Sequence, residues 1–133
     1  MPTIHHIIAV GLIAACLQAN AQDSAARVAA AKAAVRTSEG ETYDKALGPY
    51  IGKAIGACIP AGTSNPENLG SFTLIADVSS EGQVRNATVS PHSTVATCFQ
   101  AKFVQSTLPP PPGSHSAAAF SPYPIVVEMK VAP

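Results

Sequence analysis

Charged residues, tryptophan and basic clusters are all scarce in this sequence. Only 12% of the 133 residues are charged, the 8 basic and 8 acidic residues cancel, and tryptophan is absent. No run of lysine or arginine offers the phosphate contacts that nucleic acids or anionic membrane surfaces require. The composition therefore argues against both kinds of partner. The length suits one domain with a modest core.

Motifs of catalysis are missing as well. There is no GxSxG nucleophile elbow and no Cys-x-x-Cys pair. Beyond the first segment the only histidines are His92 and His115, each beside serine in a turn-like context. Asp77 and Glu81 flank a predicted turn, where acidic residues usually solvate the chain. We expect no catalytic residue, no metal and no cofactor; a small hydrolase or metal enzyme is an alternative that no motif supports.

The N-terminal segment is typical of an export signal. Residues 7–17 are apolar or small, and Ala19-Asn20-Ala21 follows them. This pattern predicts cleavage after Ala21, so that the mature chain begins at Gln22. The apolar run is shorter than the roughly 20 residues that cross a bilayer, so we expect no membrane span in the mature form. Two alternatives stay open: a lipoprotein anchored through Cys16, because residues 13–16 resemble a lipobox, or a retained buried helix.

The cysteine count agrees with export. Removal of residues 1–21 leaves Cys58 and Cys98, and an even pair in an exported chain is most simply a disulfide. Such a bond would close a loop of about 40 residues and contribute roughly 4 kcal/mol in the chain-entropy model. Two buried free thiols, or a redox or metal pair, are the alternatives, although a metal site would need further ligands.

Helical patterns dominate the first half of the mature chain. Residues 23–36 are alanine-rich and predict a helix, which 38–40 should end. A second helix is predicted over 41–57, and Pro49 indicates that its regular part begins there. Apolar residues recur on one side of this second helix: Tyr43, Leu47, Ile51, Ile55 and Cys58.

Strand patterns follow. Residues 71–78 and 83–90 predict a hairpin, with Gly82 in the turn. Ser93 or Thr94 can cap a third helix, which the prolines at 109–112 end. A last strand is predicted over 123–131. The order predicts an α+β fold: a three-stranded antiparallel sheet (order 2-1-3) with helices packed on one face, preceded by the alanine-rich helix. The predicted segments are 1–21 (signal peptide), 22–40 (alanine-rich helix or linker) and 41–133 (α+β domain).

Residues 43–132 resemble the C-terminal domain of TonB, TolA and related exported proteins. The resemblance is carried by the apolar helix, by "FTLIADVSSEGQVRNATVS", by the "TCFQAKF" helix with its upstream partner cysteine, and by the proline-rich exit into a closing strand. TonB and TolA also carry a membrane anchor and a long spacer, which we do not find here. The resemblance therefore implies a periplasmic protein-interaction module, rather than energy transduction across the envelope.

The final strand is the predicted contact surface. In a 2-1-3 sheet it lies at an edge and can accept a strand from another envelope or periplasmic protein. Its alternate residues are Ile125, Val127, Met129 and Val131. Two alternatives stay open: Glu128 and Lys130 could simply protect an idle edge, and the whole protein could be an exported inhibitor or immunity-type protein that neutralises a periplasm-acting toxin.

Overall fold

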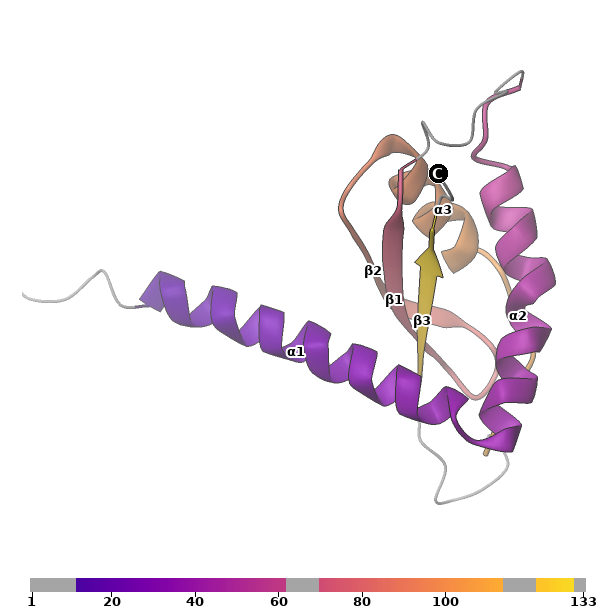
Figure 1. Ribbon diagram of the computed structural model, residues 1–133, viewed down its shortest axis with the longest axis horizontal. Coiled ribbons are helices and arrows are strands. Elements are labelled where there is room, and N and C mark those ends of the chain that lie inside the picture. The colour runs from indigo at the N-terminus through magenta and orange to yellow at the C-terminus, as the bar shows by residue number, and fades with distance from the viewer. Residues whose placement is uncertain (1–11, 62–69, 114–121, 131–133) are drawn as a thin grey trace, which may run out of the picture.

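The computed structural model describes residues 12–61, 70–113 and 122–130, with side chains from residue 23 onward. It contains six elements in the predicted order: α1 (Leu12–Val35), α2 (Ser38–Gly56), β1 (Phe72–Val78), β2 (Val84–Ser90), α3 (Thr94–Val104) and β3 (Tyr123–Met129). Helix α1 runs without interruption through the predicted cleavage site, and its first half extends away from the sheet (Figure 1). Within the described residues, no helix combines the length and apolar character needed to cross a membrane.

The three strands form one antiparallel sheet in the order β2-β1-β3, which confirms the predicted topology. Side chains of β1 alternate between a buried and a half-buried face because successive residues of a strand point to opposite sides. The buried face of the sheet joins α2 and α3 in one core. Its central members are Leu47, Phe72, Leu74, Ala76, Val78, Val89, Phe99, Phe103, Ile125 and Val127.

Helix α1 adds a third layer, on the opposite face of the sheet. Asp77 and Glu128 point away from the core side of their strands, and both contact α1: Arg27 lies 3.4 Å from Asp77, and Lys32 lies 3.2 Å from Glu128. Ala31, between these two anchors, is fully buried. The predicted packing of helices on one face therefore holds for α2 and α3, while α1 covers the other face.

Two local predictions for the helices are wrong. Gly40 does not end the first helix, because the break falls at Arg36 and Thr37, and Thr37 caps α2 by accepting a 3.0 Å hydrogen bond from the Gly40 amide. A side chain at Gly40 would collide with the carbonyl oxygen of Ala34, so the tight α1–α2 corner needs glycine. Pro49 lies inside α2, at an exposed position where water can reach the carbonyl left without its usual donor.

The segment that follows α3, from Leu108 into the prolines, contacts both the hairpin turn and α2. Leu108 donates a 2.9 Å backbone hydrogen bond to Gly82 in the hairpin turn, and the Tyr43 hydroxyl of α2 donates one of 2.9 Å to the carbonyl of Pro109. Gly82 has a φ of +84°, as the predicted turn requires, and a Cβ there would collide with the Leu108 carbonyl. The proline segment is therefore fixed to the domain as it leads from α3 toward β3.

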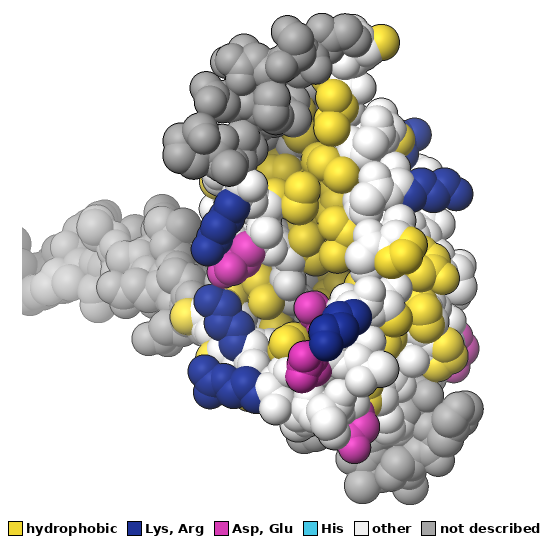
Figure 2. All heavy atoms as spheres, turned by 45° about the vertical axis from the view of Figure 1, so that its right-hand side comes forward, with side chains coloured by type: hydrophobic (Ala, Val, Ile, Leu, Met, Phe, Trp, Pro, Cys, Tyr) yellow, Lys and Arg dark blue, Asp and Glu magenta, His cyan; other side chains and the backbone are white. Residues whose placement is uncertain are grey.

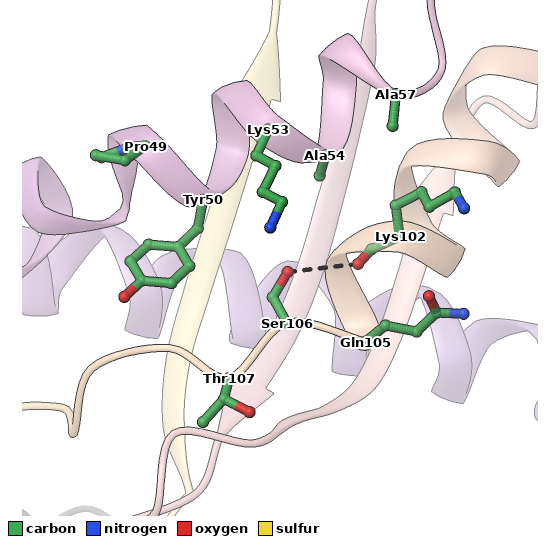
Figure 3. Close-up of a pocket in the computed structure, with 9 residues that line it drawn as sticks. All are labelled: Pro49, Tyr50, Lys53, Ala54, Ala57, Lys102, Gln105, Ser106 and Thr107. Atoms are coloured by element: carbon green, nitrogen blue, oxygen red, sulfur yellow. Dashed lines mark hydrogen bonds between the residues drawn. The ribbon is translucent and has the colours of Figure 1, made fainter.

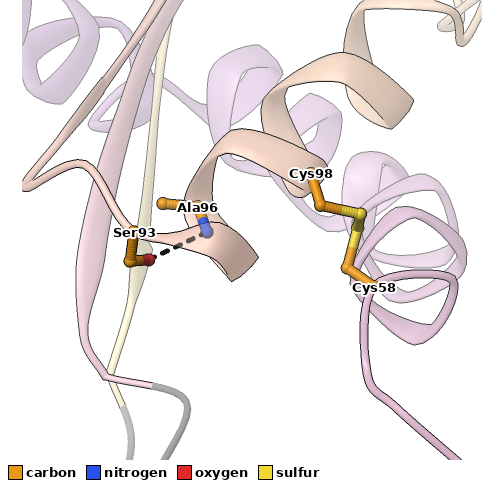
Figure 4. The surroundings of a disulfide bond; sticks show 4 residues. All are labelled: Cys58, Ser93, Ala96 and Cys98. Atoms are coloured by element: carbon orange, nitrogen blue, oxygen red, sulfur yellow. Dashed lines mark hydrogen bonds between the residues drawn. A yellow bond between two sulfur atoms is a disulfide. The ribbon is translucent and has the colours of Figure 1, made fainter.

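The disulfide joins α2 to α3. Cys58, just beyond α2, is bonded to Cys98 in α3, with 5.7 Å between the two Cα atoms (Figure 4). Helix α3 begins at the predicted cap, where the Ser93 hydroxyl accepts a 3.0 Å hydrogen bond from the Ala96 amide (Figure 4). The closed loop spans 40 residues, for which the chain-entropy model gives about 4 kcal/mol of stabilisation.

Candidate protein-binding edge

The sheet has two outer strands, and β2 is the one whose edge is occupied. Its pairing with β1 shifts register at a bulge that contains Asn86, whose φ is +51°. Arg27 donates a 2.8 Å hydrogen bond to the carbonyl of Asn86, and Gln100 donates one of 2.7 Å to the carbonyl of Ala87. Bulges and capped carbonyls are common ways to keep a sheet edge from pairing with another chain.

The start of β2 is covered by the chain that follows α3. Thr107 forms a β-bridge with Gln83, and the neighbouring Leu108 bonds to Gly82. Together with the contacts at the bulge, these contacts involve the backbone at Gly82, Gln83, Asn86 and Ala87. A further strand could therefore not pair along this stretch of β2 without displacing existing contacts.

The first half of the β3 edge is covered by the corner between α1 and α2. Val35, Gly40 and Asp44 of the corner line a cleft of only about 10 Å³ together with Pro124 and Val126 of β3. Close by, the rings of Tyr43 and Tyr123 meet edge to face with centroids 5.3 Å apart. This close packing covers β3 as far as Val126 and leaves the stretch from Val127 to Lys130 available to a partner.

The register shows which backbone groups of β3 point outward. The amide of Ser79 donates to Gln83 in the β2 direction, so by alternation Ala76 and Leu74 of β1 direct their backbone groups toward β3. Their partners there are Ile125 and Val127. The amides and carbonyls of the alternate residues, Val126 and Glu128, therefore face away from the sheet.

Helix α2 runs beside this open stretch and in the same direction as β3 (Figure 1). Four residues of a helix advance about 6 Å, and two residues of a strand advance about 6.6 Å. Tyr43 lies level with Tyr123. Further along α2, Ile51 and Ile55 therefore lie level with the end of β3. Both side chains are only half-buried against the core. Figure 2 shows apolar side chains gathered on the face that α2 and β3 share.

Three of the predicted edge residues, Ile125, Val127 and Met129, lie in β3, and their part in partner binding stays a prediction. Ile125 and Val127 are each only 6% exposed, and their side chains belong to the core. Met129 is half-buried, and Val131 lies outside the described residues. The outward groups belong to the residues between them. Sequence patterns missed this because they mark the buried face of a strand and not the direction of its hydrogen bonds.

A second concave surface lies between the ends of α2 and α3 and encloses about 630 Å³. Tyr50 and Ala54 line it together with Lys53 and Lys102, and none of its lining residues is acidic. Figure 3 shows the Lys53 amine directed across this groove and the Lys102 amine directed out of it. Both lysines lie in the last turns of their helices, where a cation offsets the helix dipole. We assign them this structural role.

The other polar residues considered from the sequence do not converge. His92 is exposed before α3, and His115 lies outside the described residues. Asp77 holds α1, while a hydrogen bond from Ser80 lowers the pKa of the exposed Glu81 carboxyl. Among the residues that the structure describes, no group of three or more His, Cys, Asp or Glu side chains lies close enough to hold a metal ion.

Comparisons of the chain with protein-family models, with curated proteins and with solved structures found no match. The resemblance of residues 43–132 to the TonB and TolA domain therefore stays a prediction from the sequence. The functional proposal below is therefore argued from the geometry of the β3 edge.

Proposed function

We propose that this protein is a non-enzymatic interaction module that captures an extended segment of another protein on the second half of β3. One observation carries the proposal: the backbone groups of Glu128 face outward beside the apolar flank of α2, whereas the β2 edge is largely occupied. A captured strand would pair with these groups through its own main chain, and its side chains would fix the register.

We place the module in the bacterial periplasm, with another envelope or periplasmic protein as its partner. The Cys58–Cys98 disulfide supports an oxidising compartment, and the resemblance to TonB and TolA implies the same location and use. The anchors of α1, Arg27 and Lys32, lie after the predicted cleavage site at Ala21. Cleavage there would therefore leave the three-layered domain intact.

The test is a substitution that removes one outward amide. Glu128→Pro deletes that donor, and proline is tolerated on an edge strand where the amide faces solvent. Glu128→Ala is the matched control, because it removes the same carboxylate and keeps the amide. Both variants are checked for folding by circular dichroism and then used, with wild-type mature protein, to capture partners from periplasmic extract.

We expect wild type and Glu128→Ala to retain the same partner and Glu128→Pro to lose it. A folded Glu128→Pro variant that captures this partner as well as wild type does would show that the β3 edge is not the binding surface.

A further inference from the structure

The open stretch of β3 lies between two walls of different chemistry. On the core side of the sheet stands α2, with the apolar side chains of Ile51 and Ile55. On the opposite side stands the end of α1, which carries Lys32, and Arg36 lies in the turn that follows the helix. A strand added beside β3 would direct alternate side chains toward these two walls, because its residues alternate between the two faces of the sheet.

The wall on the α1 side has an excess of positive charge. Lys32 forms a 3.2 Å ion pair with Glu128, and these side chains remain 52% and 41% exposed. Lys130 lies just beyond the end of β3, two residues after Glu128, and Arg36 lies in the turn that follows α1. Neither has an ion-pair partner among the described residues. Figure 2 shows basic side chains with an acidic one among them along one border of the apolar area.

Lys130 lies within the region that resembles TonB and TolA, but the cations of α1 and of the turn after it do not. Lys32 and Arg36 precede residue 43, where the resemblance begins, and Lys32 reaches Glu128 at the edge only because α1 docks across the sheet. Anchored by Arg27 at the β2 bulge, α1 ends beside β3. The position of these two cations therefore depends on the docking of α1.

We infer that the segment captured by β3 alternates apolar and acidic residues. This inference rests on the proposed function and names the chemistry of the partner. The apolar residues lie against Ile51 and Ile55, and the acidic residues lie against Lys32 and Lys130. Opposite charges across neighbouring strands stabilise pairing, and like charges oppose it. The local excess of cations therefore selects against segments that alternate apolar and basic residues.

The probes are two capped heptapeptides, one alternating valine with glutamate and the other alternating valine with lysine. Either peptide can direct its valine side chains toward α2, whether it pairs parallel or antiparallel to β3. Binding to isotope-labelled mature protein is followed by NMR through the amide of Glu128, over concentrations up to the millimolar range. We expect the glutamate peptide to bind about tenfold more tightly than the lysine peptide, with a smaller preference at high salt.

Two charge-reversal variants test which lysine causes the preference for the glutamate peptide. Lys130→Glu should remove most of the preference for the glutamate peptide. Lys53→Glu makes the same change of charge on the other flank of α2, so it should leave the preference unchanged.

The outcomes separate this inference from the proposed function. If both peptides shift the Glu128 amide with equal affinity, β3 captures strands but the acidic pattern is wrong. If Lys53→Glu lowers the preference as much as Lys130→Glu does, the basic wall is not its source and the inference fails. If neither peptide perturbs Glu128, or if the protein occupies the edge with a second copy of itself in sedimentation experiments, both the inference and the proposed function fail.

Discussion

Arg27 and Asn86 are 59 residues apart in the sequence, yet the guanidinium of Arg27 donates a 2.8 Å hydrogen bond to the carbonyl of Asn86. The Asn86 side chain in turn donates to Asp77, which also pairs with Arg27. One arginine therefore fastens α1 to the bulge of β2 and to the central strand. This contact holds α1 on the sheet, and with it Lys32 beside Glu128 of β3.

Arg27→Met should weaken this attachment. The side chains of Arg27 and Asp77 are only 20% and 14% exposed, so the loss leaves polar groups of the sheet poorly solvated. We expect the free energy of unfolding to fall by about 1–2 kcal/mol in urea denaturation. Lys45→Met is the control, because its ion pair with Glu41 is mostly exposed and should contribute less than about 0.5 kcal/mol. Equal effects of the two variants would contradict the proposed anchoring.

Gly82→Ala and Gly52→Ala should have effects of opposite sign. Gly82 has a positive φ, and a Cβ there would collide with the carbonyl of Leu108. We expect a loss of at least about 1 kcal/mol from backbone strain and the broken Gly82–Leu108 contact. Gly52 is exposed within α2 and has no atom near its would-be Cβ, so alanine should add roughly 0.5–1 kcal/mol. Thermal denaturation of both variants measures the two shifts, and a stable Gly82→Ala variant would refute the close approach.

Tyr43 should make stability depend on alkaline pH. Burial, followed by the nearby Tyr123 and Tyr50, raises the pKa of the Tyr43 phenol from 10.0 to about 12. The unfolded chain ionises this group first, so its contribution to stability is complete below pH 10 and is lost as the pH rises toward 12. Unfolding experiments over that range should show a steeper decline for wild type than for Tyr43→Phe. Parallel curves for the two proteins would show that the phenol has no raised pKa.

Much of the fold could be predicted because its signals are local. The alternation from Phe72 to Val78, the turn glycine at Gly82 and the cap at Ser93 each act within a few residues. The docking of α1 could not be predicted in this way. Its alanine-rich surface has no distinct apolar side, and its position depends on Arg27 meeting the bulge at Asn86, which sequence patterns placed in a regular strand.

The candidate site was predicted only in part, for a related reason. The pattern of β3 identified Ile125 and Val127 as one face of a strand, and this face is the buried one. Which amides point outward depends on pairing with β1, and which part of the edge is open depends on the α1–α2 corner. Both are long-range features. Because of this register, the informative position for a substitution is Glu128, whose amide faces outward, and not Val127, whose side chain is buried.

Export predicts a specific mature N-terminus. If the signal is cleaved after Ala21, the intact mass of protein isolated from the periplasm should correspond to a chain that begins at Gln22. The domain should keep its stability, because the anchors Arg27 and Lys32 remain. A mass that begins at a lipid-modified Cys16 would replace soluble export with a lipoprotein, and an unprocessed chain would reject the signal peptide.

Amide hydrogen exchange along β3 tests the central claim, that the second half of this edge is free to pair. In the free protein, the account predicts slow exchange at Val127, whose amide bonds to β1, and fast exchange at Glu128, whose amide faces outward. Addition of the captured partner should slow exchange at Glu128 and leave Val127 unchanged. Equal protection of the two amides in the free protein, or no change at Glu128 in the complex, would contradict the account.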